Sequence, residues 1–99
     1  MATLYISEYS QAGITGPGML PVANEPGATT QTVSIGGTTA QSSAFGTTTR
    51  FVRIHTDAIC SIAFGSNPTA TTAKLRLAAN QTEYFAVRPS DKVAVISNT

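Results

Sequence analysis

The strongest constraint on the fold is a set of four short apolar runs in the second half of the chain. Each run is four to six residues long and rich in β-branched or aromatic residues. The runs span residues 51–54, 59–64, 84–87 and 93–96. Such runs are too short for typical helices and are typical of β-strands. Turn-forming residues at Gly65–Pro68 and Pro89–Asp91 separate them. The pattern predicts an antiparallel β-structure organised around residues 50–97.

Alternation of apolar and polar residues extends this prediction to the first half of the chain. In residues 3–9, Leu4, Ile6 and Glu8 share one face, while Tyr5, Ser7 and Tyr9 share the other. Further strands are expected over residues 29–36, 50–56, 58–64, 74–79, 82–88 and 92–97. We therefore predict one domain, residues 1–99, folded as an all-β antiparallel sandwich of seven or eight strands, jelly-roll-like and nearly free of helix. The predicted core is Val52, Ile54, Cys60, Ile62, Phe64, Leu75, Leu77, Phe85, Val87, Val93 and Val95.

Two stretches lack the alternation of a strand. Residues 10–28 contain four glycines and three prolines, a density that predicts an extended arm without regular structure. The arm nevertheless carries apolar residues, which we expect to pack on the domain itself or on a neighbouring subunit: Ile14, Met19, Leu20 and Val22. Residues 36–49 are small and polar and predict a flexible loop. Phe45, the large apolar residue of that loop, either anchors the loop in a partner or covers the domain's own core.

The composition favours a component of a larger assembly. Thr and Ser supply 25 residues and Ala 14, whereas charged residues are only 11% of the chain. A polar but nearly uncharged surface costs little to desolvate when another protein covers it. All six basic residues lie between positions 50 and 92, so residues 1–49 carry −2 and residues 50–99 carry +3. The basic residues, Arg50 and Arg53 among them, either meet an acidic partner or keep strand edges soluble.

The chain offers few groups for catalysis or metal binding. It has one His, one Cys and five acidic residues, and metal sites need several such ligands together. His55 and Asp57 share a strand face, which suits either acid–base chemistry or a surface hydrogen bond. Cys60 alternates with Ile62 and Phe64, so we expect it to pack inward. Phosphate-binding and nucleophile-elbow motifs are missing. We predict a protein that is not an enzyme and that has no cofactor and no metal.

Targeting and nucleic-acid signals are also missing from the sequence. Residues 1–15 lack the basic start and apolar run of a signal peptide, and no segment has the roughly 18 apolar residues that span a membrane. A dense basic cluster with interleaved aromatic residues, as nucleic-acid binding needs, is not present either. We expect a protein that stays in a cytosol-like compartment or is assembled there, with no nucleic-acid or membrane partner.

Three segments of the second half resemble a known class of proteins. They are AFGSNPTAT (residues 63–71), LRLAANQTEYF (75–85) and VRPSDKVAVI (87–96). The pattern is similar to that of the small β-sandwich virion proteins encoded beside the capsid gene in tailed bacteriophages, which include the jelly-roll cement or decoration proteins. The resemblance covers about half of the chain and contains no catalytic signature.

The resemblance implies a structural role on the outer surface of a phage capsid. Such a protein would bind across joins between subunits of the major capsid protein, as a homodimer or homotrimer, on virions assembled in the host cytoplasm. The contacts would come from an N-terminal arm and loops. Here the candidate partner-binding residues are our own inference from the sequence: Ile14, Met19, Leu20, Val22, Phe45, Arg50 and Arg53. Two alternatives stay open, another phage structural module (tail, neck or fibre attachment) and a carbohydrate- or surface-binding β-sandwich, for which Tyr5, Tyr9 and Tyr84 are the aromatic candidates.

Overall fold

The computed structural model describes residues 2–10, 12–15, 18–23 and 26–99, and it contains strands but no helix in those ranges. The strands are β1 (Thr3–Tyr9), β2 (Ala12–Thr15), β3 (Gly18–Ala23), β4 (Thr29–Ser34), β5 (Ala40–Gln41), β6 (Phe51–Thr56), β7 (Cys60–Gly65), β8 (Leu75–Leu77), β9 (Thr82–Ala86) and β10 (Lys92–Ser97). The predicted all-β class is confirmed. Each strand expected from residue alternation is present close to its predicted bounds.

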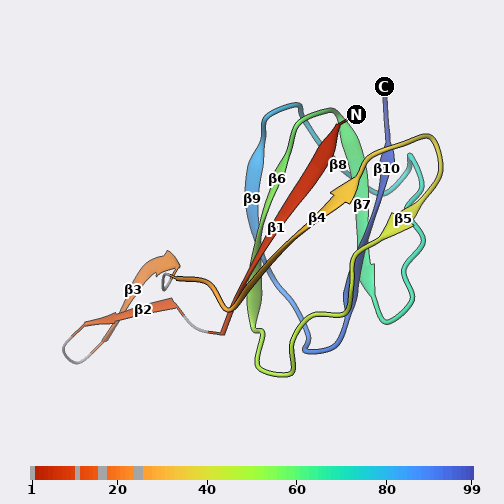
Figure 1. The fold of residues 1–99 in the computed structure, drawn as a ribbon. Coiled ribbons are helices and arrows are strands. Elements are labelled where there is room, and N and C mark those ends of the chain that lie inside the picture. The colour runs from red at the N-terminus through yellow and green to blue at the C-terminus, as the bar shows by residue number, and fades with distance from the viewer. Residues whose placement is uncertain (1, 11, 16–17, 24–25) are drawn as a thin grey trace.

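Eight of these strands form two four-stranded antiparallel sheets that pack face to face, as Figure 1 shows. Sheet 1 has the order β4-β1-β6-β9 and sheet 2 the order β5-β10-β7-β8. From β4 onward the chain crosses between the sheets at every connection except β7–β8, which is the connectivity of a jelly roll. One feature differs: the N-terminal strand β1 occupies the central place that the last strand of a jelly roll has. The predicted small β-sandwich is confirmed.

The core lies between the inner faces of the two sheets, and its composition follows from the register. Leu4 on β1 is opposite Val33 on β4, and Ile6 is opposite Ile54 on β6. Sheet 2 contributes alternate residues of β7 and β10, with Ile62 opposite Val95. The buried apolar cluster is Leu4, Ile6, Val33, Ile35, Phe45, Val52, Ile54, Cys60, Ile62, Leu77, Val93 and Val95. Phe64, Phe85 and Val87 are partly buried against it.

One predicted core residue is on the surface. Leu75 alternates with Leu77 as a core residue should, but 47% of it is exposed, whereas Leu77 is 1% exposed. The reason is the position of β8, a three-residue strand at the edge of sheet 2 that pairs only with β7 among the described strands. Alternation identifies a shared face, but at a sheet edge that face does not have to be covered.

The two outer faces of the sandwich differ. On sheet 2, residues 66–73 cross the outer face, and Pro68 and Ala70 are buried there. The covering segment is held by the Gln41 amide, which donates to the carbonyl of Pro68 at 2.8 Å, and by the Thr39 hydroxyl, which accepts from the Ala70 amide at 2.9 Å. The outer face of sheet 1, by contrast, includes the large aromatic residues Tyr5 and Tyr84, which are exposed.

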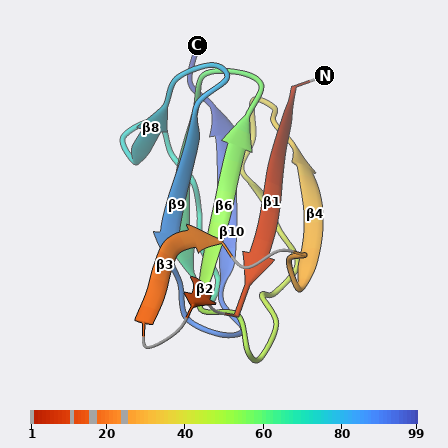
Figure 2. The ribbon, with the colours of Figure 1, turned by 90° about the vertical axis from the view of Figure 1, so that its left-hand side faces the viewer.

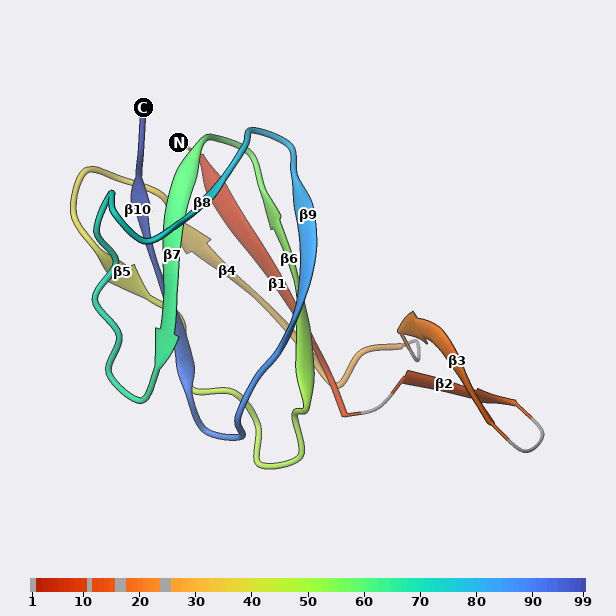
Figure 3. The same ribbon diagram turned by 180° about the vertical axis from the view of Figure 1, so that it is seen from behind.

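Residues 10–28 differ from the predicted arm without regular structure. Strands β2 and β3 pair as an antiparallel hairpin, with Ile14 opposite Met19 and an irregular register between Ala12 and Ile14. The hairpin is inserted between β1 and β4 and projects from one end of the sandwich (Figures 1 and 3). The high content of glycine and proline in residues 10–28 is typical of turns, so the sequence pattern did not indicate these two strands. A proline is tolerated in a two-stranded hairpin where its nitrogen faces the free edge of the strand, because no amide donor is needed there.

The loop predicted at residues 36–49 is held to the sandwich at several points. Its residues 40 and 41 form β5 beside β10. The Ser42 amide donates to the carbonyl of Val93 at 2.8 Å, and the Phe45 amide donates to that of Asp91 at 2.7 Å. Phe45 is 2% exposed and belongs to the core. Of the two alternatives for Phe45, the structure has the one in which the ring covers the domain's own core.

Candidate functional site

The most distinctive feature of the molecule is the end of the sandwich from which the hairpin extends, called the hairpin end below. It consists of the β2–β3 hairpin and the two loops at residues 43–50 and 87–91, which lie together at the bottom of Figure 1. The hairpin reaches outward on the side of sheet 1, so that in Figure 2 it crosses in front of the lower part of that sheet. The molecule is therefore elongated, with the hairpin projecting from the sandwich. Its longest extent is 46 Å, against 25 and 21 Å in the other directions.

Phe45 joins the two loops of the hairpin end. Its amide donates to the carbonyl of Asp91, and its own carbonyl accepts from the Ser90 amide at 3.1 Å. Ser90 has a positive φ of 69°, which allows the tight turn there. The Phe45 ring is tilted against Phe64, with 6.5 Å between the ring centroids. The backbone of Phe45 therefore connects the two loops, while its ring packs in the core. The side chain is not on the surface that a partner would meet.

A buried carboxylate fixes the same end from the other side. Glu8 is 1% exposed, although it lies on the inner face of β1 where apolar residues are expected. Its Oε1 accepts from the Thr49 hydroxyl at 2.8 Å and from the Gly46 amide at 2.9 Å, and its Oε2 accepts from the Gln31 amide at 3.1 Å. These three donors compensate for the burial of a charged group. The base of the hairpin is thereby tied to β4 and to the loop before β6.

The predicted partner-binding residues do not all come together. The apolar residues Ile14, Met19, Leu20 and Val22 belong to the hairpin strands, and their side chains lie outside the described part of the structure. Arg50 is exposed at the hairpin end, where its amide donates to the carbonyl of Tyr9, the last residue of β1, at 2.8 Å. Arg53 is three residues further along the chain and lies on the outer face of sheet 1.

Aromatic residues are divided between the core and one outer face. Phe45, Phe64 and Phe85 point into the sandwich, whereas Tyr5, Tyr9, Tyr84 and Phe51 lie on the outer face of sheet 1. Tyr9 stacks on Phe51, with 5.1 Å between ring centroids and 17° between the ring planes. Tyr9 is only 3% exposed, but Tyr5 and Tyr84 are 43% and 56% exposed. Two of the three tyrosines are thus available to a ligand or partner.

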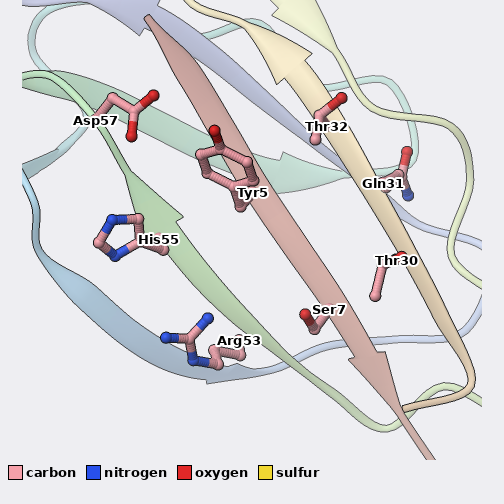
Figure 4. Close-up of a pocket in the computed structure, with 8 residues that line it drawn as sticks. All are labelled: Tyr5, Ser7, Thr30, Gln31, Thr32, Arg53, His55 and Asp57. Atoms are coloured by element: carbon pink, nitrogen blue, oxygen red, sulfur yellow. The ribbon is translucent and has the colours of Figure 1, made fainter. Parts of the chain in front are cut away.

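A shallow hollow of about 730 Å³ lies on this face, over β4, β1 and β6 (Figure 4). It combines an exposed ring, hydroxyl groups, a guanidinium, an imidazole and a carboxylate. The lining residues are Tyr5, Ser7, Thr30, Gln31, Thr32, Arg53, His55 and Asp57. The register explains the clustering: His55 is directly opposite Tyr5, and Arg53 is directly opposite Ser7. Sequence alternation had placed Tyr5 and Ser7 on one face of their strand and Arg53 and His55 on an outward face, but it does not tell which strands are neighbours.

The single histidine and the single cysteine have structural partners. His55 Nδ1 is 2.7 Å from the hydroxyl of Thr82, the opposite residue on β9. Cys60 is fully buried, as predicted, and its thiol donates to the Thr56 hydroxyl at 3.4 Å. Burial raises the pKa of the Cys60 thiol, and the hydrogen bond to Thr56 opposes that effect. The thiol is therefore protonated and shielded in the folded protein.

The described residues contain neither a metal-ligand cluster nor a membrane-spanning helix. No group of three or more His, Cys, Asp or Glu side chains lies close enough together there to hold a metal ion. The described ranges also contain no helix with the length and apolar character to cross a membrane. Comparison with known proteins found no match to the chain among protein families, curated proteins or solved structures.

Proposed function

We propose that this protein is a virion structural component that binds the outer surface of a phage capsid and bridges neighbouring major capsid protein subunits. The observation that carries the proposal is the projecting β2–β3 hairpin. An isolated two-stranded hairpin is marginally stable in water at best. This one also has four apolar residues in its strands, Ile14, Met19, Leu20 and Val22. A partner surface that covers the hairpin would remove this disadvantage.

The hairpin suits such a partner in two ways. Its apolar side chains can be buried, and the free edge of each strand can pair with an extended strand of the partner. Burial of about 400 Å² of apolar surface contributes roughly 10 kcal/mol before any costs are subtracted. Ordering an unstructured arm would cost about 1–2 kcal/mol per residue. A hairpin whose strands are already paired loses less entropy on docking than an unstructured arm.

The sandwich end beside the hairpin provides a rigid base for the contact. The Glu8 network and the Phe45 hydrogen bonds hold its loops in place, so little entropy is lost there on binding. Arg50 and Arg88 are exposed at this end and favour an acidic partner surface. The sparsely charged Thr- and Ser-rich surface also suits close contact with other proteins.

Binding of several copies of the protein would reinforce the capsid shell. Each bound copy would bridge subunits that have to separate when the shell breaks. A homodimer or homotrimer would hold several hairpins near the capsid at once, and binding would then gain from effective concentration. Light scattering on the purified chain should accordingly give the mass of a dimer or trimer, about two or three times the 10.2 kDa of one chain.

The proposal is tested on particles of the phage that encodes the chain. Quantitative mass spectrometry of gradient-purified particles should find the protein in a fixed ratio to the major capsid protein, and labelled antibody should mark the head in electron micrographs. Label confined to the tail, neck or fibres would favour the alternative structural role. Absence of the protein from purified particles would contradict both roles.

A further inference from the structure

We propose that the hollow on the outer face of sheet 1 binds an uncharged saccharide. Such a site would give the protein a second, glycan-binding activity, separate from the attachment through the hairpin end. The hollow lies on the body of the sandwich, whereas the proposed capsid contact is the hairpin end (Figures 1 and 4).

The first argument is the chemistry of the lining. A pyranose ring has C–H groups on its faces and hydroxyl groups around its rim, so it needs an aromatic platform beside hydrogen-bonding groups. Tyr5 supplies the platform, since the residue is 43% exposed and lines the hollow, and Tyr suits contacts that are apolar on one side and wet on the other. Ser7 and Thr30 provide hydroxyls that can donate and accept.

Two charged side chains of the hollow have no partner among the described residues. Neither the Arg53 guanidinium nor the Asp57 carboxylate has a hydrogen bond or ion pair with any residue in the described ranges. His55 is oriented by the contact of its Nδ1 with Thr82, 2.7 Å away, so Nε2 is the nitrogen left for a ligand. A guanidinium donates up to five hydrogen bonds and a carboxylate only accepts, which matches the mixed demands of sugar hydroxyls.

The charges of the lining balance, and this favours an uncharged ligand. Arg53 and Asp57 lie two residues on either side of His55, with Asp57 one residue beyond the end of β6. They are about 13 Å apart at a rise of about 3.3 Å per residue. The lining therefore has one cationic and one anionic side chain and no net formal charge with His55 neutral. Such a lining provides no net electrostatic attraction for an acidic ligand. The hydroxyl-rich lining equally disfavours a fully apolar ligand, and the volume of about 730 Å³ is within the range of about 300–1,000 Å³ for small-molecule sites.

The chain itself offers a matched control. Tyr84 lies on the same outer face and is 56% exposed, but it is not part of the hollow. It is opposite Arg53 on β9, and its ring is tilted against Phe51 at 6.3 Å. Removing the ring of Tyr84 therefore changes the aromatic character of the face while every lining residue of the proposed site is kept.

The test uses the full-length chain on a printed array of neutral, sialylated and sulfated saccharides, followed by titration calorimetry with the best-bound saccharide. We expect retention on neutral saccharides. Tyr5→Ala should weaken binding about tenfold or more, Tyr5→Phe should retain most of it, and Tyr84→Ala should stay within about twofold. Asp57→Asn, at an exposed position, should weaken binding while leaving the thermal unfolding midpoint unchanged.

Three results would overturn the proposal: no retention on any saccharide, retention only on sialylated or sulfated saccharides, or equal affinity for wild type and Tyr5→Ala. A variant that lacks the hairpin should keep its saccharide affinity, because the lining residues all belong to β4, β1 and β6 or to Asp57 beside them. That variant separates a failure of the glycan site from a failure of the capsid proposal.

Discussion

The Thr49 hydroxyl donates a 2.8 Å hydrogen bond to the buried Glu8 carboxylate across 41 residues of sequence. Both side chains are 1% exposed. The bond joins the end of β1 to the loop before β6, and it closes the base from which the hairpin extends. A charged group inside a small sandwich is tolerated because its oxygens are hydrogen-bonded, and loss of one donor leaves part of that burial uncompensated.

We therefore expect Thr49→Val, which keeps the shape and removes the hydroxyl, to lower the free energy of unfolding by about 1–3 kcal/mol. The neighbouring exposed residue provides the control, since Thr48→Val should change stability by less than about 0.5 kcal/mol. Urea unfolding followed by circular dichroism measures both. Equal effects of the two substitutions would show that the Glu8–Thr49 bond contributes nothing to stability.

Leu75 and Leu77 form a second matched pair, because they share a strand and a face but differ in burial. Leu77→Ala should cost about 2–5 kcal/mol, as for other fully buried leucines, while Leu75→Ala should cost less than about 1 kcal/mol because the side chain is half exposed. Thermal and urea unfolding of the two variants test the difference. Similar losses would mean that Leu75 is covered in solution.

Cys60 gives a prediction for high pH. Burial raises the pKa of this thiol above its ordinary value of 9.0, so the folded state keeps the proton to a higher pH than the unfolded state. The thiol therefore does not affect the pH dependence of stability well below pH 9.0. Above that value the unfolded thiol ionises first, and the free energy of unfolding falls until the folded thiol also ionises.

Urea unfolding of wild type and Cys60→Ala between about pH 7 and pH 10 isolates this contribution. Loss of the Cys60 side chain should change the free energy of unfolding of the variant by the same amount at every pH. Above pH 9.0, however, the free energy of unfolding should fall less steeply for the variant than for the wild type. Parallel curves for the two proteins over the whole range would contradict a raised pKa.

Much of the sandwich could be predicted from local patterns. Residues such as Val52 and Ile54 alternate with polar neighbours, and alternation alone identifies a strand and its buried face. Two kinds of feature could not be found this way. The two-residue strand β5 is too short to have a period. The β2–β3 hairpin has glycines and prolines that locally favour turns, and the pairing of its strands overrides them.

The sites depended on contacts that are distant in sequence. Glu8 could be assigned to the same face as Leu4 and Ile6, but its three donors lie 23, 38 and 41 residues away. The available signal was that a charged residue, Glu8, alternates with apolar residues. This signal did not identify the residues that donate hydrogen bonds to its carboxylate. Likewise Tyr5 and His55 were each expected to face outward. Only the pairing of β1 with β6 brings them into one hollow.

We propose that the projecting hairpin attaches this protein to a capsid. This proposal is tested most directly with a variant in which two glycines replace residues 11–25. This short link is feasible because β1 and β4 are neighbours, with Glu8 opposite Thr29. We expect the variant to fold with a thermal midpoint close to that of the wild type, since the hairpin projects from the sandwich (Figure 1).

The measurement is the number of copies bound per particle when particles that lack the protein are incubated with equal amounts of wild type or variant. At free protein concentrations below the wild-type Kd, we expect occupancy by the folded variant to fall at least about tenfold, the loss that about 1.4 kcal/mol of binding free energy produces there. Its particles should also break at a lower temperature than particles incubated with the same amount of wild type. Equal occupancy and equal particle stability with wild type and variant would contradict the proposal.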